Sequence, residues 1–190
     1  MAAARAAFFL RGFHAATVED IAQAAGVSKV TVYSRFGDKE TLFEEVIRAE
    51  SGRMAGVFDD GMSAGRCLAE RLNSYGTVLM GFMFSEEHMA VDRVLMNEIA
   101  QSPRLAERFY QAGPGMCLGR LAEVLGEAAM QGEIEVDDPW RAAEDLCGLW
   151  KGISDMSVKL GLEPVPTPEA IQARVERATR LFLKMVGSKA

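Results

Sequence analysis

Basic and hydroxyl side chains are concentrated in one short segment, GVSKVTVYSRFGDKETLF at residues 26–43. Ammonium and guanidinium groups bind phosphate oxygens, and small hydroxyl groups donate or accept hydrogen bonds at the edges of bases. A catalytic site does not require this mixture, whereas binding in a groove of a nucleic acid does. The side chains concerned are Lys29, Thr31, Tyr33, Arg35 and Lys39.

In a helix over residues 29–36, apolar, small and charged side chains would lie on different sides. At about 100° per residue, Val32 and Phe36 fall on one side, and Val27 is expected to join them in the interior. The opposite side carries only small side chains, which allow close approach to base edges in the major groove: Val30, Thr31 and Ser34. Their methyl groups can touch a thymine methyl, and their hydroxyls can bond to bases.

The flanks of this helix carry groups suited to phosphates. Lys29 and Tyr33 lie on one flank and Arg35 on the other, while Lys39 follows at the start of the next helix. Phosphate contacts fix the register of a protein on a duplex but carry little sequence information. An ordinary solvated amphipathic helix is the alternative interpretation of the same residues.

Another helix is predicted before residues 29–36, and the short connection between the two is typical of a helix-turn-helix. Thr17 is expected to start it, with Asp20 at the third helical position as in a short capping box. Its buried face is expected to hold Val18, Ile21, Ala22 and Ala25. Gly26 ends this helix and Ser28 can cap the next one, so the residues AAGVS form the tight connection.

The remainder of the chain predicts further helices and no sheet, so the expected fold class is all-α. Gly and Pro mark the joints. Helices are expected at 2–11, where Gly12 stops the first one, from about 38, and near 64–84, 86–101, 103–112, 114–131, 138–161 and 168–187. The stretch GEIEVDDP at 132–139 is interpreted as a loop, because two or three alternating residues do not make a sheet.

Composition narrows the class of protein. The 190 residues carry a net charge of −6, which argues against nonspecific coating of nucleic acid. Residues 1–39 nevertheless hold five basic and three acidic residues, a local charge of +2. No apolar run approaches the ~18–20 residues of a membrane span, and no secretion signal begins the chain, so we expect a cytoplasmic protein without a membrane partner.

Neither a metal site nor an enzyme is expected. Cys67, Cys117 and Cys147 lack metal-binding spacing and are expected to be reduced and buried, and no cofactor is expected. The paired carboxylates Glu86-Glu87 and Asp137-Asp138 are adjacent, so they would diverge on a helix. No Gly-rich phosphate loop follows a strand.

Residues 8–47, FFLRGFHAATVEDIAQAAGVSKVTVYSRFGDKETLFEEVI, resemble the DNA-binding domain of TetR-family transcriptional regulators. The resemblance implies a DNA-binding domain at 1–47 and an effector-binding and dimerisation domain at 48–190, of which 93–150 resembles the AefR-like subgroup. It implies base contacts from Lys29, Val30, Thr31 and Ser34 and backbone contacts from Thr17, Tyr33 and Lys39, with Arg35 in either role. Ser28, at the start of the same helix, completes the expected DNA-binding residues. Family members commonly carry a basic arm before the first helix; this sequence offers only Arg5 there, so either the arm is short or the numbered chain starts inside a longer gene product.

The resemblance further implies a repressor that binds a pseudo-palindromic operator as a homodimer and is released by a small molecule. The dimer is expected to form through about 114–131 and 138–161, where Gly119, Gly126, Gly148 and Gly152 could allow close helix approach. Packing within one protomer is the alternative reason for these glycines. A ligand-sequestering or adaptor protein with weakened DNA binding is the alternative function.

The effector pocket is expected among Met and Phe side chains, because Met adapts to irregular shapes and ligand pockets are mostly apolar. A neutral or hydrophobic effector is favoured, since no cluster of charged residues points to a charged one. A plain hydrophobic core is the alternative. The candidate residues are Met80, Met83, Phe84, Phe109, Met116 and Trp150.

Overall fold

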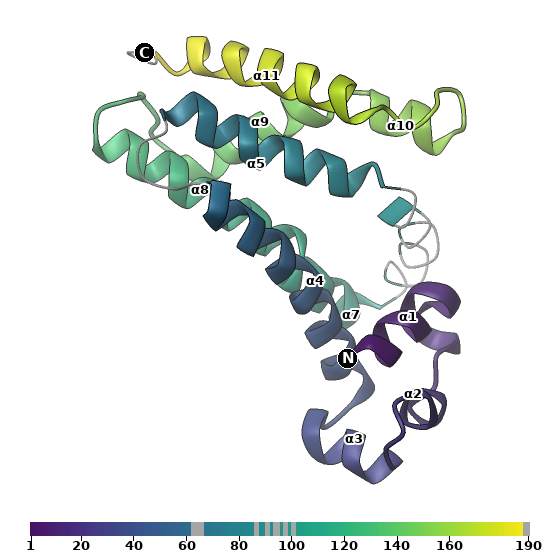
Figure 1. The fold of residues 1–190 in the computed structure, drawn as a ribbon. Coiled ribbons are helices and arrows are strands. Elements are labelled where there is room, and N and C mark those ends of the chain that lie inside the picture. The colour runs from purple at the N-terminus through teal and green to yellow at the C-terminus, as the bar shows by residue number, and fades with distance from the viewer. Residues whose placement is uncertain are drawn as a thin grey trace. The chain divides into compact units, whose positions relative to one another are not determined.

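A computed structural model describes residues 1–61, 67–85, 88–89, 92, 96, 99 and 102–187. Helices make up all of the regular structure in these residues, and none of them lies in a strand, so the predicted all-α class is confirmed. The chain divides into two compact units (Figure 1). The first combines residues 1–52 with 87–116, and the second combines 53–86 with 117–190.

The first unit contains the two helices of the predicted helix-turn-helix and the helices that pack around them. These are α1 (Ala2–Ala15), α2 (Val18–Ala24), α3 (Lys29–Phe36), the first part of α4 (Lys39–Gly61) and α7 (Pro103–Ala112). Gly12 leaves the helical conformation inside α1 with φ +83°, which confirms the predicted stop at this glycine. Helix α7 therefore belongs to the same unit as the helix-turn-helix, although the sequence places it in the second domain.

Aromatic side chains form the centre of the first unit. The ring of Phe43 on α4 lies 5.2 Å from that of Phe8 and 5.3 Å from that of Phe13, both in edge-on geometry. Leu105 of α7 is buried in the same cluster, and Phe109 stacks on Phe43 at 6.4 Å. The side chains of this core pack α1, α4 and α7 against one another, and the shorter helices α2 and α3 pack on the same core.

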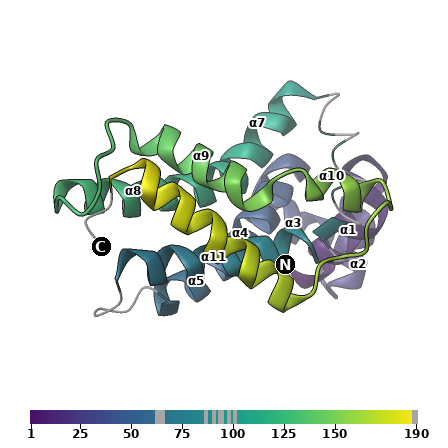
Figure 2. The same ribbon diagram turned by 90° about the horizontal axis from the view of Figure 1, so that it is seen from above.

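The second unit contains the last part of α4 and the helices of the C-terminal part. They are α5 (Leu68–Met83), α8 (Pro114–Met130, from Cys117 onward), α9 (Pro139–Lys151), α10 (Ser154–Lys159) and α11 (Pro168–Met185). Helix α11 packs against both α5 and α9 (Figures 1 and 2). The N-termini of α9 and α11 are capped by Asp138 and Thr167, whose side chains accept backbone N–H bonds.

Two polar aromatic side chains lie in the core of the second unit, and both have hydrogen-bond partners. The indole N–H of Trp150 donates to Thr179 Oγ1 at 3.0 Å, and the Tyr75 hydroxyl donates to the Cys117 carbonyl at 2.5 Å. The two rings stack at 6.2 Å. Because buried polar groups are costly when unpaired, these bonds let large aromatic residues fill the core.

The predicted helix over 138–161 is wrong as a single element. Helix α9 ends at Lys151, Gly152 adopts φ +53°, and α10 begins at Ser154. Glycine takes a positive φ at little cost, so it can break a helix whose apolar periodicity continues on both sides. Helix α5 begins at Leu68, after Cys67 in an extended conformation, and residues 64–66 of the predicted helix lie outside the described residues. Of the predicted helix at 86–101, residues 88–89, 92, 96 and 99 are described, and they are helical.

Close packing in the second unit requires glycine at position 76. An ideal Cβ there would stand 2.7 Å from the Trp150 ring and 2.8 Å from Val175 Cγ1. Such distances are too short for carbon atoms in contact, so α5 approaches α9 and α11 only because Gly76 lacks a side chain.

We expect Gly76→Ala to destabilise the protein by about 1–3 kcal/mol, because the methyl group overpacks the core against Trp150. Gly81→Ala on the same helix is the matched control: no described atom lies within 4 Å of its Cβ position. That change should be neutral or stabilise by up to about 1 kcal/mol through helix propensity. Urea unfolding measures both; equal effects would contradict the packing role of Gly76.

Candidate nucleic-acid interface

Helices α2 and α3 are joined by a turn with a hydrogen-bonded cap at each helix start. The Thr17 hydroxyl accepts from the Asp20 N–H at 3.1 Å, and Ser28 Oγ accepts from the Thr31 N–H at 3.1 Å. Gly26 turns the chain with φ +69°. The capping roles predicted for Thr17 and Ser28 are therefore confirmed, and each such cap is typically worth about 1 kcal/mol.

The two sides of α3 differ as the sequence predicts. Val32 is 7 % exposed and Phe36 packs half-buried against the aromatic core, whereas Val30 is 76 % exposed. Thr31 and Ser34 are exposed beside Val30. The face that points to solvent is thus small and hydroxylated, as close approach to base edges requires.

Two residues of the turn do not lie where the sequence predicts. Val27 is 42 % exposed and Ala25 is also exposed, although both were expected to be buried. Helix α2 ends at Ala24, and α3 begins only at Lys29. Both residues therefore lie between helices, where a helical projection does not describe the direction of their side chains.

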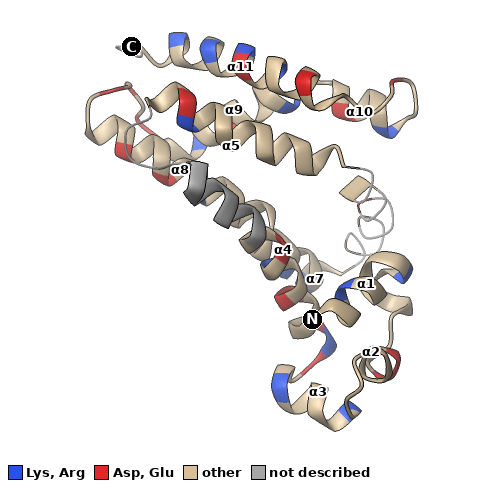
Figure 3. Ribbon diagram, viewed as in Figure 1, with Lys and Arg blue, Asp and Glu red and all other residues tan. Residues whose placement is uncertain are grey.

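The two basic residues of α3, Lys29 and Arg35, lie toward opposite ends of the helix (Figure 3). The Lys29 ammonium pairs with the Glu19 carboxylate of α2 and lies 5.6 Å from the centre of the Tyr33 ring. The Arg35 guanidinium lies 5.5 Å from the Phe36 ring. Lys29 and Glu19 bond to each other, which lowers the pKa of Glu19 and raises that of Lys29.

Glu19 is a member of this surface that the sequence did not reveal. It is separated from Lys29 by ten residues, a spacing that no local pattern marks as a contact. A second pair, Arg11 with Asp20 at 2.7 Å, joins α1 to α2 in the same way. Both pairs are exposed, so water screens them and a phosphate or a base can exchange for the carboxylate.

Lys39 is anchored within the protein. Its ammonium donates to the His14 carbonyl at 3.2 Å and lies 4.6 Å from the centre of the Phe13 ring. These contacts connect the first residue of α4 to the end of α1. Because an ammonium has more than one proton to donate, the anchored group can also reach a phosphate, and that role stays a prediction.

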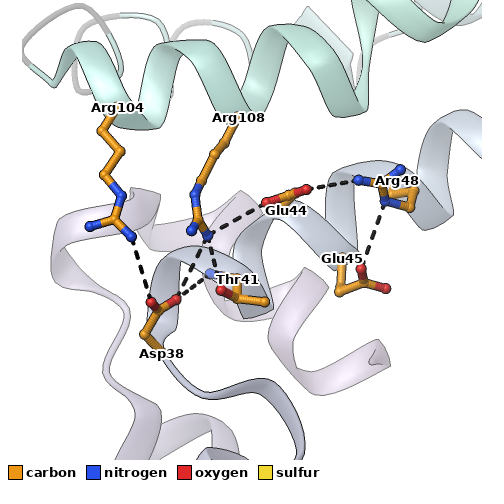
Figure 4. A network of polar contacts seen from close by, with 7 residues as sticks. All are labelled: Asp38, Thr41, Glu44, Glu45, Arg48, Arg104 and Arg108. Carbon is orange, nitrogen blue, oxygen red and sulfur yellow. Dashed lines mark hydrogen bonds and ion pairs between the residues drawn. The ribbon is translucent and has the colours of Figure 1, made fainter.

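A network of polar contacts surrounds the first turn of α4 (Figure 4). Asp38 Oδ1 accepts from the Thr41 N–H at 2.6 Å and so begins the helix. From α7, Arg108 donates to Thr41 Oγ1 at 2.9 Å and lies 3.5 Å from Glu44 Oε2. The bonds from Thr41 and, less strongly, the nearby charges of Arg108 and Arg104 lower the pKa of Asp38.

The six candidate effector residues divide between the two units. Met80, Phe84 and Trp150 are buried in the second unit, where Met83 is half-buried. Phe109 and Met116 belong to the first unit, where Phe109 packs on Phe43. The structure therefore brings four of the six into one compact unit, and a ligand-binding role for any of them stays a prediction.

Among the described residues, no group of three His, Cys, Asp or Glu side chains could hold a metal ion. Burial raises the pKa of the Cys117 thiol to about 11 and that of Cys147 to about 12, so both are protonated at neutral pH. Cys67 is exposed and Cys147 is half-buried, so the prediction that all three cysteines are buried holds only for Cys117. The Glu86-Glu87 pair lies outside the described residues. No described helix has both the length and the apolar composition of a membrane span.

Comparison with known proteins finds matches to the N-terminal part, to the C-terminal part and to the whole chain. A family model described as bacterial regulatory proteins, tetR family, matches residues 1–46, and one described as AefR-like transcriptional repressor, C-terminal domain, matches 70–186. The structure of the flavonoid-responsive regulator FrrA is 35 % identical with a TM-score of 0.80, covering 100 % of this chain and 95 % of that one.

Two further relatives agree with these matches. A TetR-family regulator from Mesorhizobium loti is 26 % identical with a TM-score of 0.80, covering 97 % of this chain and 93 % of that one. The HTH-type transcriptional repressor AcnR of Corynebacterium glutamicum is 39 % identical over 57 residues. The AcnR match spans 30 % of each protein.

We expect the contribution of Asp38 to stability to depend on pH. Its folded-state pKa is lowered, so the stabilisation is complete above its unfolded pKa of ~3.9 and is lost as the pH falls through the folded value. The difference in unfolding free energy between the wild type and Asp38→Asn should be constant near pH 7 and shrink below about pH 4. Asp137→Asn, at an exposed position, is the control. A difference for Asp38→Asn that stays constant down to pH 3 would contradict the charged cap.

Proposed function

The chain belongs to the TetR family and is a DNA-binding transcriptional regulator, and we propose that it represses transcription by inserting α3 into the major groove of a pseudo-palindromic operator. It acts as a homodimer, and a neutral aromatic small molecule releases it. The observation that carries the DNA-binding mode is the exposure of Val30 beside two small hydroxyl residues while Val32 is buried.

Base recognition is assigned to the exposed face of α3. The methyl groups of Val30 and Thr31 suit contact with a thymine methyl, and the Ser34 hydroxyl can donate or accept at a base edge. Lys29 can reach a guanine once it leaves Glu19, since the pair is exposed. The short side chains keep the helix close to the floor of the groove.

Backbone contacts are assigned to side chains at the edges of the same surface. Tyr33 and Arg35 flank α3, Thr17 starts α2, and Lys39 starts α4. Thr17 and Tyr33 offer hydroxyls and the other two offer charge, which suits phosphate oxygens in either case. Ser28 supports the interface by capping α3, which also orients the first N–H groups of the helix.

A homodimer follows from the length of α3. Eight residues of helix read only a few base pairs, so two protomers related by a two-fold axis are the usual solution. We assign the dimer contact to α8, α9 and α10, which correspond to the segments 114–131 and 138–161. Exposed apolar side chains in and next to α10 support this assignment, since a second copy would cover them: Ile153, Met156 and Leu160.

The glycines of these helices give partial support for the dimer. Ideal Cβ atoms at Gly119 and Gly126 would meet Trp140 and Pro139 of the same protomer at ordinary contact distances of 3.7 and 3.5 Å. Packing within the protomer therefore does not require glycine at either position. No described atom lies within 4 Å of the Cβ position at Gly148, which leaves room there for a partner helix.

The effector is assigned to the neutral aromatic class, and a flavonoid is the specific candidate. FrrA, named as flavonoid-responsive, is similar to this chain over its whole length. On α5, Asn73 lies seven residues before Met80 and eleven before Phe84, so the three share one face of the helix. Asn73 Oδ1 is buried without a hydrogen-bond partner in the described residues, and it could accept a phenolic proton.

We expect Thr31→Ala and Tyr33→Phe to affect DNA binding in different ways. Loss of a base contact at Thr31 should relax preference at one base pair of each half-site, at a cost of about 1–3 kcal/mol. Loss of a phosphate contact at Tyr33 should weaken binding to all sequences alike. Selection of duplexes from a random pool, followed by affinities for single-base variants, measures both. An unchanged base preference in Thr31→Ala would remove Thr31 from the base-reading face.

We expect a flavonoid such as naringenin to bind the wild type and to reduce its affinity for the selected operator. Asn73→Ala should raise the dissociation constant by roughly 2- to 10-fold, the usual value of one neutral hydrogen bond. Ser74→Ala, one residue further along α5, is the control and should change it little. Isothermal titration calorimetry measures the affinities. Equal binding by the wild type and Asn73→Ala would contradict the assigned role of Asn73.

A further inference from the structure

Two arginines of α7 reach from a distant part of the sequence to the first turn of α4. Arg104 and Arg108 are four residues apart, so they lie one above the other on the same face of the helix (Figure 4). Arg108 Nη1 lies 2.9 Å from Thr41 Oγ1, 3.5 Å from Glu44 Oε2 and 3.8 Å from Asp38 Oδ1. Arg104 Nη2 lies 3.9 Å from Asp38 Oδ2. All of these residues belong to the first unit.

The first turn of α4 is connected to α3 by very little chain. Helix α3 ends at Phe36, Gly37 follows with φ +79°, and Asp38 already caps α4. The Asp38 N–H also donates to the Phe36 carbonyl at 3.0 Å. Any displacement of the first turn of α4 is therefore passed directly to the end of α3.

The ion pair of Arg108 with Glu44 is less exposed to water than the ion pair of Arg104 with Asp38. Its side chain is 23 % exposed and that of Glu44 is 24 % exposed, whereas the Arg104 side chain is 66 % exposed. All three contacts of Arg108 are made by one nitrogen, Nη1, whose N–H directions are fixed by the planar guanidinium, whereas a lysine ammonium rotates freely on a flexible stem. Arg108 thus fixes both the position and the orientation of the turn, while Arg104 adds a screened charge.

We propose that Arg108 is a positioning residue for DNA binding, which holds the first turn of α4, and through it α3, in the orientation that reads the operator. This inference rests on the proposed function, in which α3 enters the major groove. Arg108 acts through Thr41, Glu44 and Asp38 and makes no contact with DNA. Its removal should lower affinity for the operator without lowering affinity for unrelated duplexes.

The experiment compares Arg108→Met, Arg108→Lys and the control Arg48→Met. Arg48 pairs with Glu44 at 2.7 Å but contacts neither Thr41 nor Asp38 in the structure. Each variant is titrated with the operator selected by the wild type and with a scrambled duplex of equal length, at several salt concentrations. Thermal unfolding of each variant shows whether it is folded under the conditions of the titration.

We expect Arg108→Met to weaken operator binding at least ten-fold and to leave scrambled-duplex binding within two-fold. The slope of log affinity against log salt should not change, because no phosphate contact is lost. Arg108→Lys should fall between the wild type and Arg108→Met, and Arg48→Met should match the wild type. If Arg108→Met does not fold, Thr41→Val removes the same hydrogen bond from the other side and should give a smaller loss of the same kind.

Three results would overturn the inference. One is unchanged operator affinity in the folded Arg108→Met or, where that variant does not fold, in Thr41→Val. A second is an equal loss on operator and scrambled duplex, and a third is a salt slope reduced by about one, which marks a direct phosphate contact. A wild type that selects no duplex would instead overturn the proposed function, and this inference with it.

Discussion

Burial of one side of α3 is the constraint on which the DNA-binding surface depends. Eight residues are too few to form a stable helix alone in water. The helix therefore persists because Val32 is buried, Phe36 packs against the aromatic core and Ser28 caps its start. Since this support comes from the buried side and from the cap, the exposed side can consist of small side chains that add nothing to packing. Stability and recognition are thus assigned to opposite sides of one helix.

The same division of roles extends to the residues around α3. Lys39 and Arg108 both bear charges that could bind phosphate, yet each is engaged with the protein at the first turn of α4. Lys29, in contrast, lies beside the Tyr33 ring and pairs with an exposed carboxylate that a ligand can replace. Arg108 is therefore assigned to positioning alone, whereas Lys39 holds the end of α1 and, with more than one proton to donate, keeps the phosphate contact proposed for it.

Local sequence patterns predicted the elements of this surface well because their causes are local. Helical periodicity placed Val32 inside and Val30 outside, and hydroxyl residues at helix starts marked the caps at Thr17 and Ser28. The patterns failed where tertiary context decides. The break at Gly152 depends on backbone conformation, and the contacts Lys29–Glu19 and Arg108–Thr41 join residues with no regular spacing. The Met and Phe pattern could not assign Phe109 to one unit and Met80 to the other.

Methylation interference on the selected operator tests insertion of α3 into the major groove most directly. Guanine N7 lies in the major groove and adenine N3 in the minor groove, so methyl groups at the two positions block different modes of binding. We expect interference at guanine N7 in two clusters separated by about one helical turn or a multiple of it, as two copies of α3 would give. Interference confined to adenine N3, or none at guanine in either half-site, would contradict that mode of binding.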